Sequence, residues 1–269
     1  MAQVINTNIY SLNAQRNLMN SQASMQTSLQ RLSSGLRINS AKDDAAGLAI
    51  SERMTAQIRG LNQAMRNAND GISMLQTAEG AMDEIGNMLQ RMRELAVQAA
   101  NGTVNATDKA SLQTEFAALR TEIGRQTSAA TFNNTALLGG ATVALQVGHR
   151  NTDTINVTMA NVGTLASAAD DISTSEATAR AAIANVDTDI GTITTARGAL
   201  GATQNTLEST VRNLANVSEN MSAARSRIRD ADFAAETANL TRTQILQQAG
   251  AAMLAQANLV PQNVLTLLR

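Results

Sequence analysis

The chain contains no cysteine, no tryptophan and very few other aromatic residues. The missing cysteines exclude disulfide bonds and thiol chemistry, so folding does not depend on the redox compartment. Because aromatic residues make up 1% of the 269 residues, the core must be aliphatic, and the 12 methionines help to fill it. The single proline, Pro261, leaves nearly the whole chain free to form long helices.

Charge is scarce as well, and it is balanced. The net charge of −1 excludes a strongly basic surface, and with it a nucleic-acid partner. The only histidine, His149, stands in a predicted turn without the set of neighbouring ligands that a metal or catalytic site needs. The carboxylate pairs Asp43 with Asp44 and Asp230 with Asp232 precede predicted helices, which favours capping over acid–base catalysis. We therefore expect no enzymatic activity, no cofactor and no metal.

The two ends of the chain are almost free of charge. Arg242 is followed by 26 uncharged residues before Arg269, and the first acidic residue is Asp43. Seven side-chain amides in residues 243–268 argue against membrane insertion, because each would need a hydrogen-bond partner in hydrocarbon. Residues 1–30 do not resemble a cleavable signal peptide, so we expect any export to use a dedicated route. Apolar, amide-rich ends predict burial in an assembly, and we expect them to be disordered in the monomer and to order on assembly.

A seven-residue repeat dominates the second half of the chain and predicts a long coiled-coil helix. The repeat is formed by Val186, Ile193, Leu200, Leu207, Leu214, Met221 and Ile228. The companion seam is mixed and includes Arg197 and Arg225, for which two interpretations stay open: snorkelling beside the seam, or an ion pair across a partner helix. A second heptad pattern at residues 58–99, with one phase slip, predicts the antiparallel partner.

Between these helices the sequence predicts a third helix and a β-hairpin. Apolar residues at 112, 116, 119 and 123 form the stripe of this helix. Alternating residues on both sides of a polar turn at 148–153 predict a hairpin at about 141–159, followed by a loop. We expect Ser40 with Asp43 to cap the second helix, and Thr107 or Asp108 to cap the third.

Together these patterns predict a mainly α fold: a long antiparallel helical coiled-coil bundle with one small β-hairpin, in which the terminal helices pair. Residues 1–44 and 226–269 are expected to form a discontinuous inner core domain, and residues 45–225 a rod-like helical domain that carries the hairpin. Apolar residues step by three and four along both terminal helices. The candidate assembly residues are Leu18, Met25, Leu29, Leu32, Leu246, Met253, Leu259, Val260, Val264, Leu267 and Leu268.

Several segments at both ends carry a family resemblance. They are residues 5–8 (INTN), 11–18 (SLNAQRNL), 32–39 (LSSGLRIN), 41–47 (AKDDAAG), 89–98 (LQRMRELAVQ), 230–234 (DADFA), 247–250 (QQAG), 257–258 (AN), 261–262 (PQ) and 267–269 (LLR). In this order they resemble bacterial flagellin, the subunit of the flagellar filament, over essentially the whole chain. Only about 45 residues separate the third and fourth predicted helices, so we expect a short form without outer inserted domains.

The resemblance implies a structural, non-enzymatic subunit that forms a helical homopolymer for bacterial motility. It implies an extracellular location in the flagellar filament and export of the unfolded chain through the flagellar export apparatus. It also implies an export chaperone and the hook-associated junction and cap proteins as partners. Two alternatives remain at this point: a hook–filament junction protein, and a secreted immune ligand or effector that forms no filament.

The resemblance further implies recognition of the monomer by the vertebrate toll-like flagellin receptor. The residues that carry over are Gln90, Arg91, Glu94, Leu95 and Glu115. We expect this patch to serve twice, as a polymerisation contact in the filament and as the receptor target in the released monomer.

Overall fold

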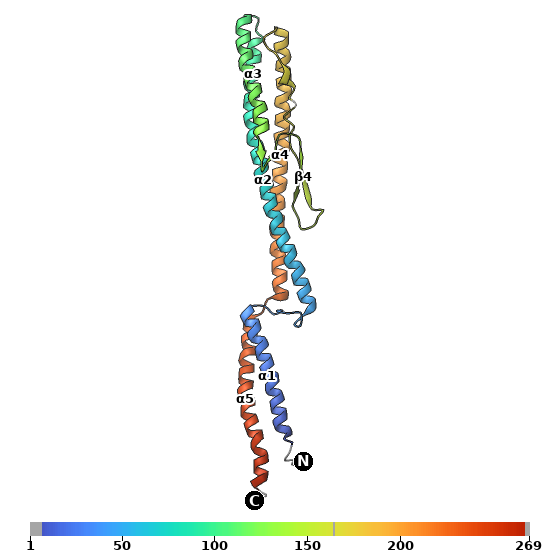
Figure 1. Cartoon of the computed structure of the whole chain (residues 1–269), viewed down its shortest axis with the longest axis vertical. Helices are drawn as coiled ribbons and strands as arrows, with labels where there is room; N and C mark the ends of the chain where they lie inside the picture. Colours follow the sequence, from blue (N-terminus) through green and yellow to red (C-terminus); the bar gives the residue numbers. More distant parts are fainter. Residues whose placement is uncertain (1–6, 164, 267–269) are drawn as a thin grey trace. The chain divides into compact units, whose positions relative to one another are not determined.

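The computed structural model describes residues 7–163 and 165–266, with side chains as far as Leu259, and it confirms a mainly helical chain (Figure 1). The described helices are α1 (Ile9–Ser34), α2 (Ala45–Ala99), α3 (Ala106–Ala129), the short 3-10 helix η1 (Ala166–Ala169), α4 (Glu176–Arg229) and α5 (Phe233–Thr266). The described strands are β1 (Thr131–Phe132), β2 (Thr135–Ala136), β3 (Thr142–Gln146) and β4 (Thr154–Thr158). The order of helices is the predicted one.

The chain divides into two compact units, and the boundaries between them fall inside the long helices α2 and α4. Unit 1 comprises residues 1–56 and 220–269 and contains α1 and α5, which lie side by side and antiparallel (Figure 1). Unit 2 comprises residues 57–219 and contains α3, both hairpins and most of α2 and α4. The predicted pairing of the terminal helices is therefore confirmed.

The heptad repeat of α4 forms the stripe that packs against α2. Val186, Ile193, Leu200, Leu207 and Leu214 are all buried. The corresponding stripe of α2 is buried too, at Leu61, Ala68, Leu75, Met82, Leu89 and Ala96. Because residues seven apart return to the same face of a helix, each seam buries a continuous apolar line along unit 2.

The segment before α2 differs from our expectation. Ser40 donates hydrogen bonds from its backbone N–H and its hydroxyl to Asp43 Oδ2, at 2.9 and 3.0 Å, and closes a turn ahead of the helix. The start of α2 is capped by Asp44 instead, whose Oδ1 accepts the backbone N–H of Gly47 at 2.8 Å. The expected cap was therefore wrong: Asp44 directly precedes the helix and reaches the N–H three residues later, whereas Asp43 is used by the turn.

The start of α3 also differs. Asn105 caps the helix, and its Oδ1 accepts the backbone N–H of Asp108 at 2.8 Å. Thr107 and Asp108, which were the expected caps, lie inside the first turn. The apolar stripe was predicted correctly, since Phe116 and Ile123 are buried and contribute to the core of unit 2.

Two β-hairpins follow α3. The predicted hairpin is present as β3 paired with β4 in an antiparallel register that sets Val143 opposite Val157 and Leu145 opposite Ile155. A second, smaller hairpin joins β1 to β2 and was not predicted. Its turn consists of Asn133 and Asn134, with φ of 45° and 65°, a left-handed conformation that asparagine tolerates better than other non-glycine residues.

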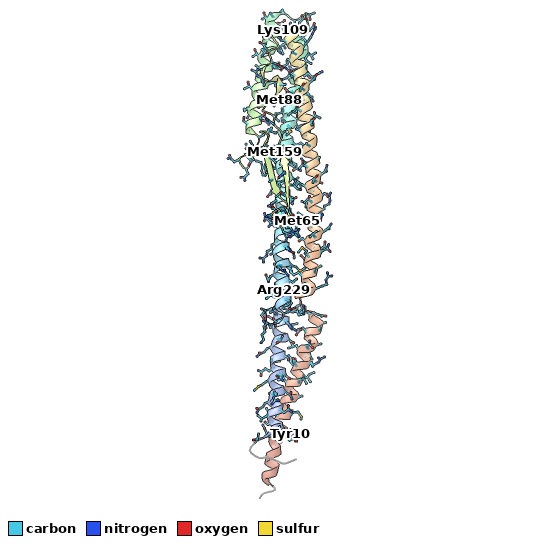
Figure 2. All side chains as sticks on the ribbon, turned by 90° about the vertical axis from the view of Figure 1, so that its right-hand side faces the viewer. Tyr10, Met65, Met88, Lys109, Met159 and Arg229 are labelled. Atoms are coloured by element: carbon cyan, nitrogen blue, oxygen red, sulfur yellow. The ribbon has the colours of Figure 1, made fainter. Side chains whose placement is uncertain are left out.

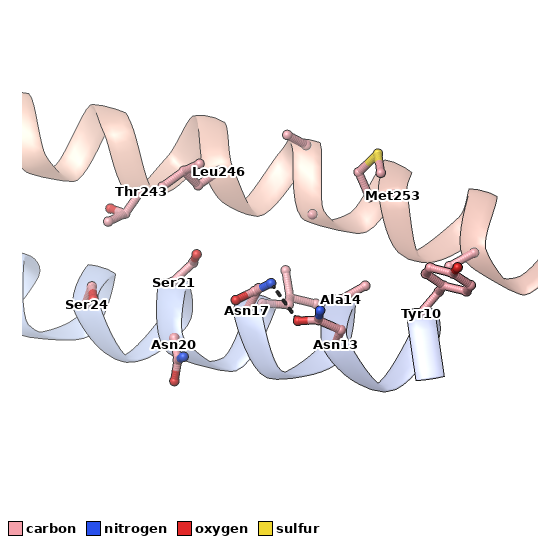
Figure 3. Close-up of a pocket in the computed structure, with 14 residues that line it drawn as sticks. Tyr10, Asn13, Ala14, Asn17, Asn20, Ser21, Ser24, Thr243, Leu246 and Met253 are labelled. Atoms are coloured by element: carbon pink, nitrogen blue, oxygen red, sulfur yellow. Dashed lines mark hydrogen bonds between the residues drawn. The ribbon is translucent and has the colours of Figure 1, made fainter. Parts of the chain in front are cut away.

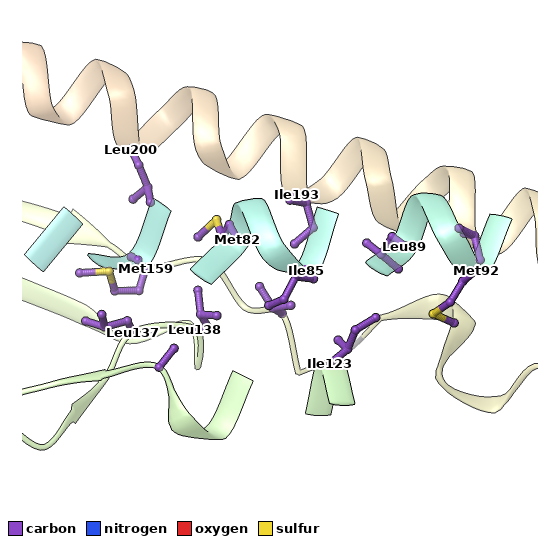
Figure 4. Packing of buried hydrophobic residues seen from close by; sticks show 14 of the residues in the cluster. Met82, Ile85, Leu89, Met92, Ile123, Leu137, Leu138, Met159, Ile193 and Leu200 are labelled. Carbon is purple, nitrogen blue, oxygen red and sulfur yellow. The ribbon is translucent and has the colours of Figure 1, made fainter. Parts of the chain in front are cut away.

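Apart from Phe116, the buried core of unit 2 is aliphatic, and it includes Met82, Met92 and Met159, as predicted (Figure 4). Figure 2 labels Met159 among all the side chains of the chain. In Figure 4, α2 contributes Met82 and Leu89, α3 contributes Ile123, and α4 contributes Ile193. Met159, just after β4, joins the same cluster, so the segment that contains the hairpins is packed against the helices. Buried side chains from four consecutive parts of the chain give unit 2 a continuous core of its own.

A buried carboxylate fixes the loop that carries η1. Asp189 on α4 is buried, and its two oxygens accept the backbone N–H groups of Ala166 and Ser167 at 2.7 and 2.9 Å. These two N–H groups stand at the start of η1, where they have no partner within the helix. Asp189 therefore caps η1 from another helix and holds the loop that carries η1 against α4.

Candidate assembly and recognition surfaces

The apolar side chains that remain exposed are concentrated on unit 1. Of the 13 large hydrophobic residues that are exposed in the described part of the chain, 11 belong to unit 1. The two in unit 2 are Val97 and Val217. A soluble monomer rarely gathers so much exposed apolar surface in one part, and such a patch marks an interaction surface.

The predicted assembly residues lie on α1 and α5, with different degrees of exposure. Leu18, Met25 and Leu32 are half-buried. The exposed members are Leu29, Leu246, Met253 and Leu259. Val260 and Val264 belong to the backbone of α5, but their side chains lie outside the described part, and Leu267 and Leu268 lie outside the described residues altogether. The apolar faces of the two terminal helices are therefore only partly covered by each other.

A groove of about 640 Å³ lies between α1 and α5 (Figure 3). Its α1 wall is polar and includes Asn13 and Asn17, whose side chains are joined by a 3.2 Å hydrogen bond from Asn17 Nδ2 to Asn13 Oδ1. The α5 wall is more apolar and includes Leu246 and Met253. The groove thus combines apolar side chains with uncharged amides, as the composition of the chain ends predicted.

The segments that connect α1 to α2 and α4 to α5 pair with each other. Leu36 and Asp230 form an isolated antiparallel bridge, and the backbone N–H of Arg37 donates to the carbonyl of Arg229 at 2.7 Å. Ile38 is fully buried beside this bridge. The sequence does not predict this contact, because a single bridge between opposite halves of the chain leaves no local periodic pattern.

The predicted recognition residues gather where α2 and α3 lie side by side in unit 2. Arg91 Nη1 lies 2.8 Å from Glu94 Oε2, and Arg91 Nε donates to Glu115 Oε1 at 2.9 Å. The hydrogen bonds to Glu94 and then to Glu115 raise the pKa of the Arg91 guanidinium above its usual value. Gln90 is also exposed. We refer to Gln90, Arg91, Glu94 and Glu115 as the Arg91 patch.

Leu95 does not share this surface. Its side chain is 1% exposed and belongs to the core cluster of unit 2. Leu95 lies outside the two heptad seams of α2, but it belongs to the buried cluster to which α3 contributes Phe116 and Ile123. Leu95 therefore supports the Arg91 patch from beneath and is not part of its accessible surface.

The structure shows which partners the two arginines beside the α4 seam, Arg197 and Arg225, contact. Arg197 on α4 lies 2.8 Å from Asp83 on α2, so the interpretation as an ion pair holds for this residue, within the same chain. Arg225 instead donates to the hydroxyl of Thr55 at 3.4 Å. A further cross-helix pair, which the heptad pattern did not predict, joins Arg93 to Asp187 at 2.6 Å. The ion pairs of Arg197 and Arg93 thus link α4 to α2 within unit 2.

Across residues 7–163 and 165–266, no helix combines the length and the apolarity that crossing a membrane requires. Within the same residues, no three His, Asp or Glu side chains are grouped so that they could hold a metal ion.

Two family models match the chain. The bacterial flagellin N-terminal helical region matches residues 5–142, and the bacterial flagellin C-terminal helical region matches residues 183–268. These matches cover α1 to β2, most of α4 and all of α5, so they include both terminal helices of unit 1.

Relatives align with this chain from end to end. The flagellin of Halalkalibacterium halodurans is 51% identical over 99% of this chain and 100% of its own length. The flagellar filament 33 kDa core protein of Treponema phagedenis is 45% identical over 99% of this chain and 100% of its own length. Flagellin D of Vibrio anguillarum is 35% identical over an alignment of 376 residues that covers all of both chains, so it carries inserted residues that this chain lacks.

A solved structure supports the same conclusion. The crystal structure of Bacillus cereus flagellin is 33% identical and has a TM-score of 0.52, over 60% of this chain and 94% of that chain. Flagellins are structural proteins that polymerise with themselves into the extracellular flagellar filament. The exposed apolar helices of unit 1, the two family models and the full-length relatives show that this chain belongs to the bacterial flagellin family, as a short member of about 270 residues.

Proposed function

We propose that residues 1–44 and 226–269 form the polymerisation domain of a filament subunit, and that residues 45–225 form its rod-like domain. The observation that carries this proposal is the concentration of exposed apolar side chains on unit 1, 11 of 13 in the described residues. Burial of apolar surface is the main driving force of protein association. Copies of the chain would bury this surface against one another.

The membership of the flagellin family supports an open fibre as the product of this association. Contacts between different patches on successive copies generate a helical filament when the rotation between copies does not close into a ring. The groove between α1 and α5 is lined by uncharged side chains, which include Tyr10, Asn13, Leu246 and Met253. Such surfaces tolerate slightly different packings at little cost, which would allow the filament to supercoil.

Polymerisation of the purified full-length chain tests this proposal. Salt-precipitated protein should form long filaments in electron micrographs, and filament seeds should extend without limit. A hook–filament junction protein would stop after a few copies, and an immune ligand without a structural role would form no filament under any condition. A protein that stays monomeric at all concentrations, with protease-resistant helical ends, would refute the proposal.

Export and the partners of the chain follow from the same function. We propose that the chain leaves the cell unfolded through the flagellar export apparatus, with a chaperone bound to residues 230–269. Once outside, it would assemble between the hook-associated junction and cap proteins. Removal of residues 230–269 should abolish binding of the chaperone in calorimetry. Unchanged binding by the truncated chain would show that the chaperone site lies elsewhere.

The Arg91 patch is the proposed contact with the vertebrate toll-like flagellin receptor, and a contact between neighbouring subunits in the filament. It presents a guanidinium held in place by two carboxylates, at 2.8 and 2.9 Å, on an exposed face. Geometry that is fixed before binding lowers the entropic cost of recognition. Arg93 is about as exposed as Arg91 and therefore provides a natural control on the same helix.

Matched arginine variants distinguish recognition from general loss of an ion pair. Arg91→Ala should weaken activation of the receptor by the monomer, whereas Arg93→Ala removes the pair with Asp187 and should leave activation unchanged. Both variants should unfold at similar denaturant concentrations, because exposed ion pairs contribute little to stability. Equal activation by wild type and Arg91→Ala would overturn the assignment.

A further inference from the structure

The only proline of the chain lies inside a helix. Pro261 falls within α5, which extends from Phe233 to Thr266. In an α-helix the carbonyl of each residue accepts the backbone N–H four positions later. Proline has no backbone N–H, so the carbonyl of Ala257 lacks its regular donor within α5. A carbonyl in this state requires a donor from another part of the molecule or from water.

A side chain of α1 provides that donor. Asn8 Nδ2 donates a hydrogen bond to the carbonyl oxygen of Ala257 at 2.7 Å, across 249 residues of sequence. The same side chain caps α1, because its Oδ1 accepts the backbone N–H of Ser11 at 3.2 Å. One amide therefore satisfies a free N–H at the start of α1 and a free carbonyl in α5. A serine in this place could cap the helix but is too short to reach the second partner.

Other contacts along the pair agree with one register. Near the middle, a Cβ added to Gly250 would lie 3.2 Å from Leu18 Cδ1, so the helices approach closely at a glycine. Towards the connecting segments, Arg31 lies 3.7 Å from the buried carboxylate of Glu236. Residue numbers rise along α1 as they fall along α5, from Asn8 with Ala257 to Arg31 with Glu236. These contacts fix both ends of the pair.

We propose that Asn8 is the positioning residue that sets the register of α1 against α5, through the carbonyl that Pro261 leaves without a partner. The inference rests on the proposed polymerisation through unit 1, since a shift in register would displace the exposed side chains that neighbouring copies contact. Pro261 then has a role in assembly, because it leaves free the carbonyl group to which the side chain of Asn8 donates a hydrogen bond.

A double-mutant cycle in the full-length chain tests this pairing. Asn8→Ser keeps the cap and removes the donor, and Pro261→Ala restores the N–H that the carbonyl of Ala257 lacks. With proline at 261, Asn8→Ser should raise the critical concentration for polymerisation about five-fold, the change that corresponds to one hydrogen bond. With alanine at 261, the same substitution should change it less than two-fold. If Asn8→Ser does not polymerise at all, Pro261→Ala should restore its filaments.

The possible failures are distinguishable. If the wild-type chain forms no filaments, the proposed function fails. If it does, and Asn8→Ser has the same effect in both backgrounds or no effect with proline, the register proposal fails while the function stands. If Pro261→Ala itself polymerises poorly, the critical concentration is no longer a useful measurement. The amount of each labelled variant that is incorporated into wild-type filaments is then measured instead. Incorporation that depends on residue 8 only when residue 261 is proline supports the pairing, and incorporation without this dependence overturns it.

Discussion

Replacing one methionine in each unit by alanine should separate folding from assembly. Met82 is 0% exposed in the core of unit 2, and Met253 is 64% exposed on α5. Met82→Ala removes fully packed atoms and leaves a cavity, so it should lower the free energy of unfolding of the monomer by about 2–5 kcal/mol. Met253→Ala removes a side chain that contacts little in the monomer, and the free energy of unfolding should change by less than about 0.5 kcal/mol.

Met253→Ala should instead have its main effect on polymerisation. Full burial of a methionine side chain contributes about 1.5–3 kcal/mol, of which nearly two-thirds remains available to Met253 when copies associate. Met253→Ala should therefore weaken association by about 1–2 kcal/mol, which raises the critical concentration roughly 5- to 30-fold.

Urea denaturation of the monomer, monitored by circular dichroism, gives the free energy of unfolding. Sedimentation of filaments at increasing protein concentration gives the critical concentration. A Met253→Ala chain that polymerises at the wild-type concentration would refute the idea that assembly buries this face. A large loss of monomer stability in the same variant would show that α5 is already packed in the monomer.

Other predictions concern local features of the two units. Gly47→Ala should destabilise unit 1 by about 1–2 kcal/mol, because the added Cβ would lie 2.4 Å from the carboxylate that caps α2. At Gly86 an added Cβ meets no atom within 4 Å, so Gly86→Ala should stabilise α2 by up to about 1 kcal/mol. Denaturation experiments measure both changes. Asp189→Ala should lower the free energy of unfolding by about 3 kcal/mol, since two backbone N–H groups of η1 lose their acceptor, and rapid amide exchange at η1 should accompany it. Hydrogen bonds from the backbone N–H and hydroxyl of Ser40 lower the pKa of Asp43 below 3.8, so its stabilising effect is present above that pH and is lost as the pH falls through the lower, folded value. The difference in unfolding free energy between wild type and Asp43→Asn should therefore shrink in acid below about pH 3.8, and a constant difference would contradict the assignment.

The long helices were predictable because their signal is periodic and repeated. Each of the buried heptad residues from Val186 to Leu214 contributes the same information, so a single exception such as Arg197 does not hide the seam. The resemblance to flagellins likewise depended on several segments in the correct order. Because these signals are repeated along the sequence, both the fold and the candidate assembly helices can be predicted from it.

Features decided by one side chain were predicted less well. Asp43 and Asp44 are neighbouring carboxylates of the same type, and only their geometry shows that the second caps α2. The small hairpin at Asn133 and Asn134 has strands of two residues, too short for an alternating pattern, although the paired asparagines are a turn signal that could have indicated it. Leu95 was placed on the surface because a helical position is buried or exposed according to its neighbours, and the packing of α3 is not encoded in α2.

The distribution of polar partners explains how a chain with so little charge keeps a specific structure at its ends. Apolar burial is non-directional, so on its own it does not select one register of α1 against α5. Specificity must come from groups whose hydrogen bonds are lost when the helices slide, since an unpaired buried polar group costs more than a paired one gains. Asn8 opposite Ala257 and Arg31 opposite Glu236 are such groups, at the two ends of the helix pair. The exposed apolar side chains between them can then contribute to assembly without also having to define the register, which leaves the contacts between copies free to adjust along a curved filament.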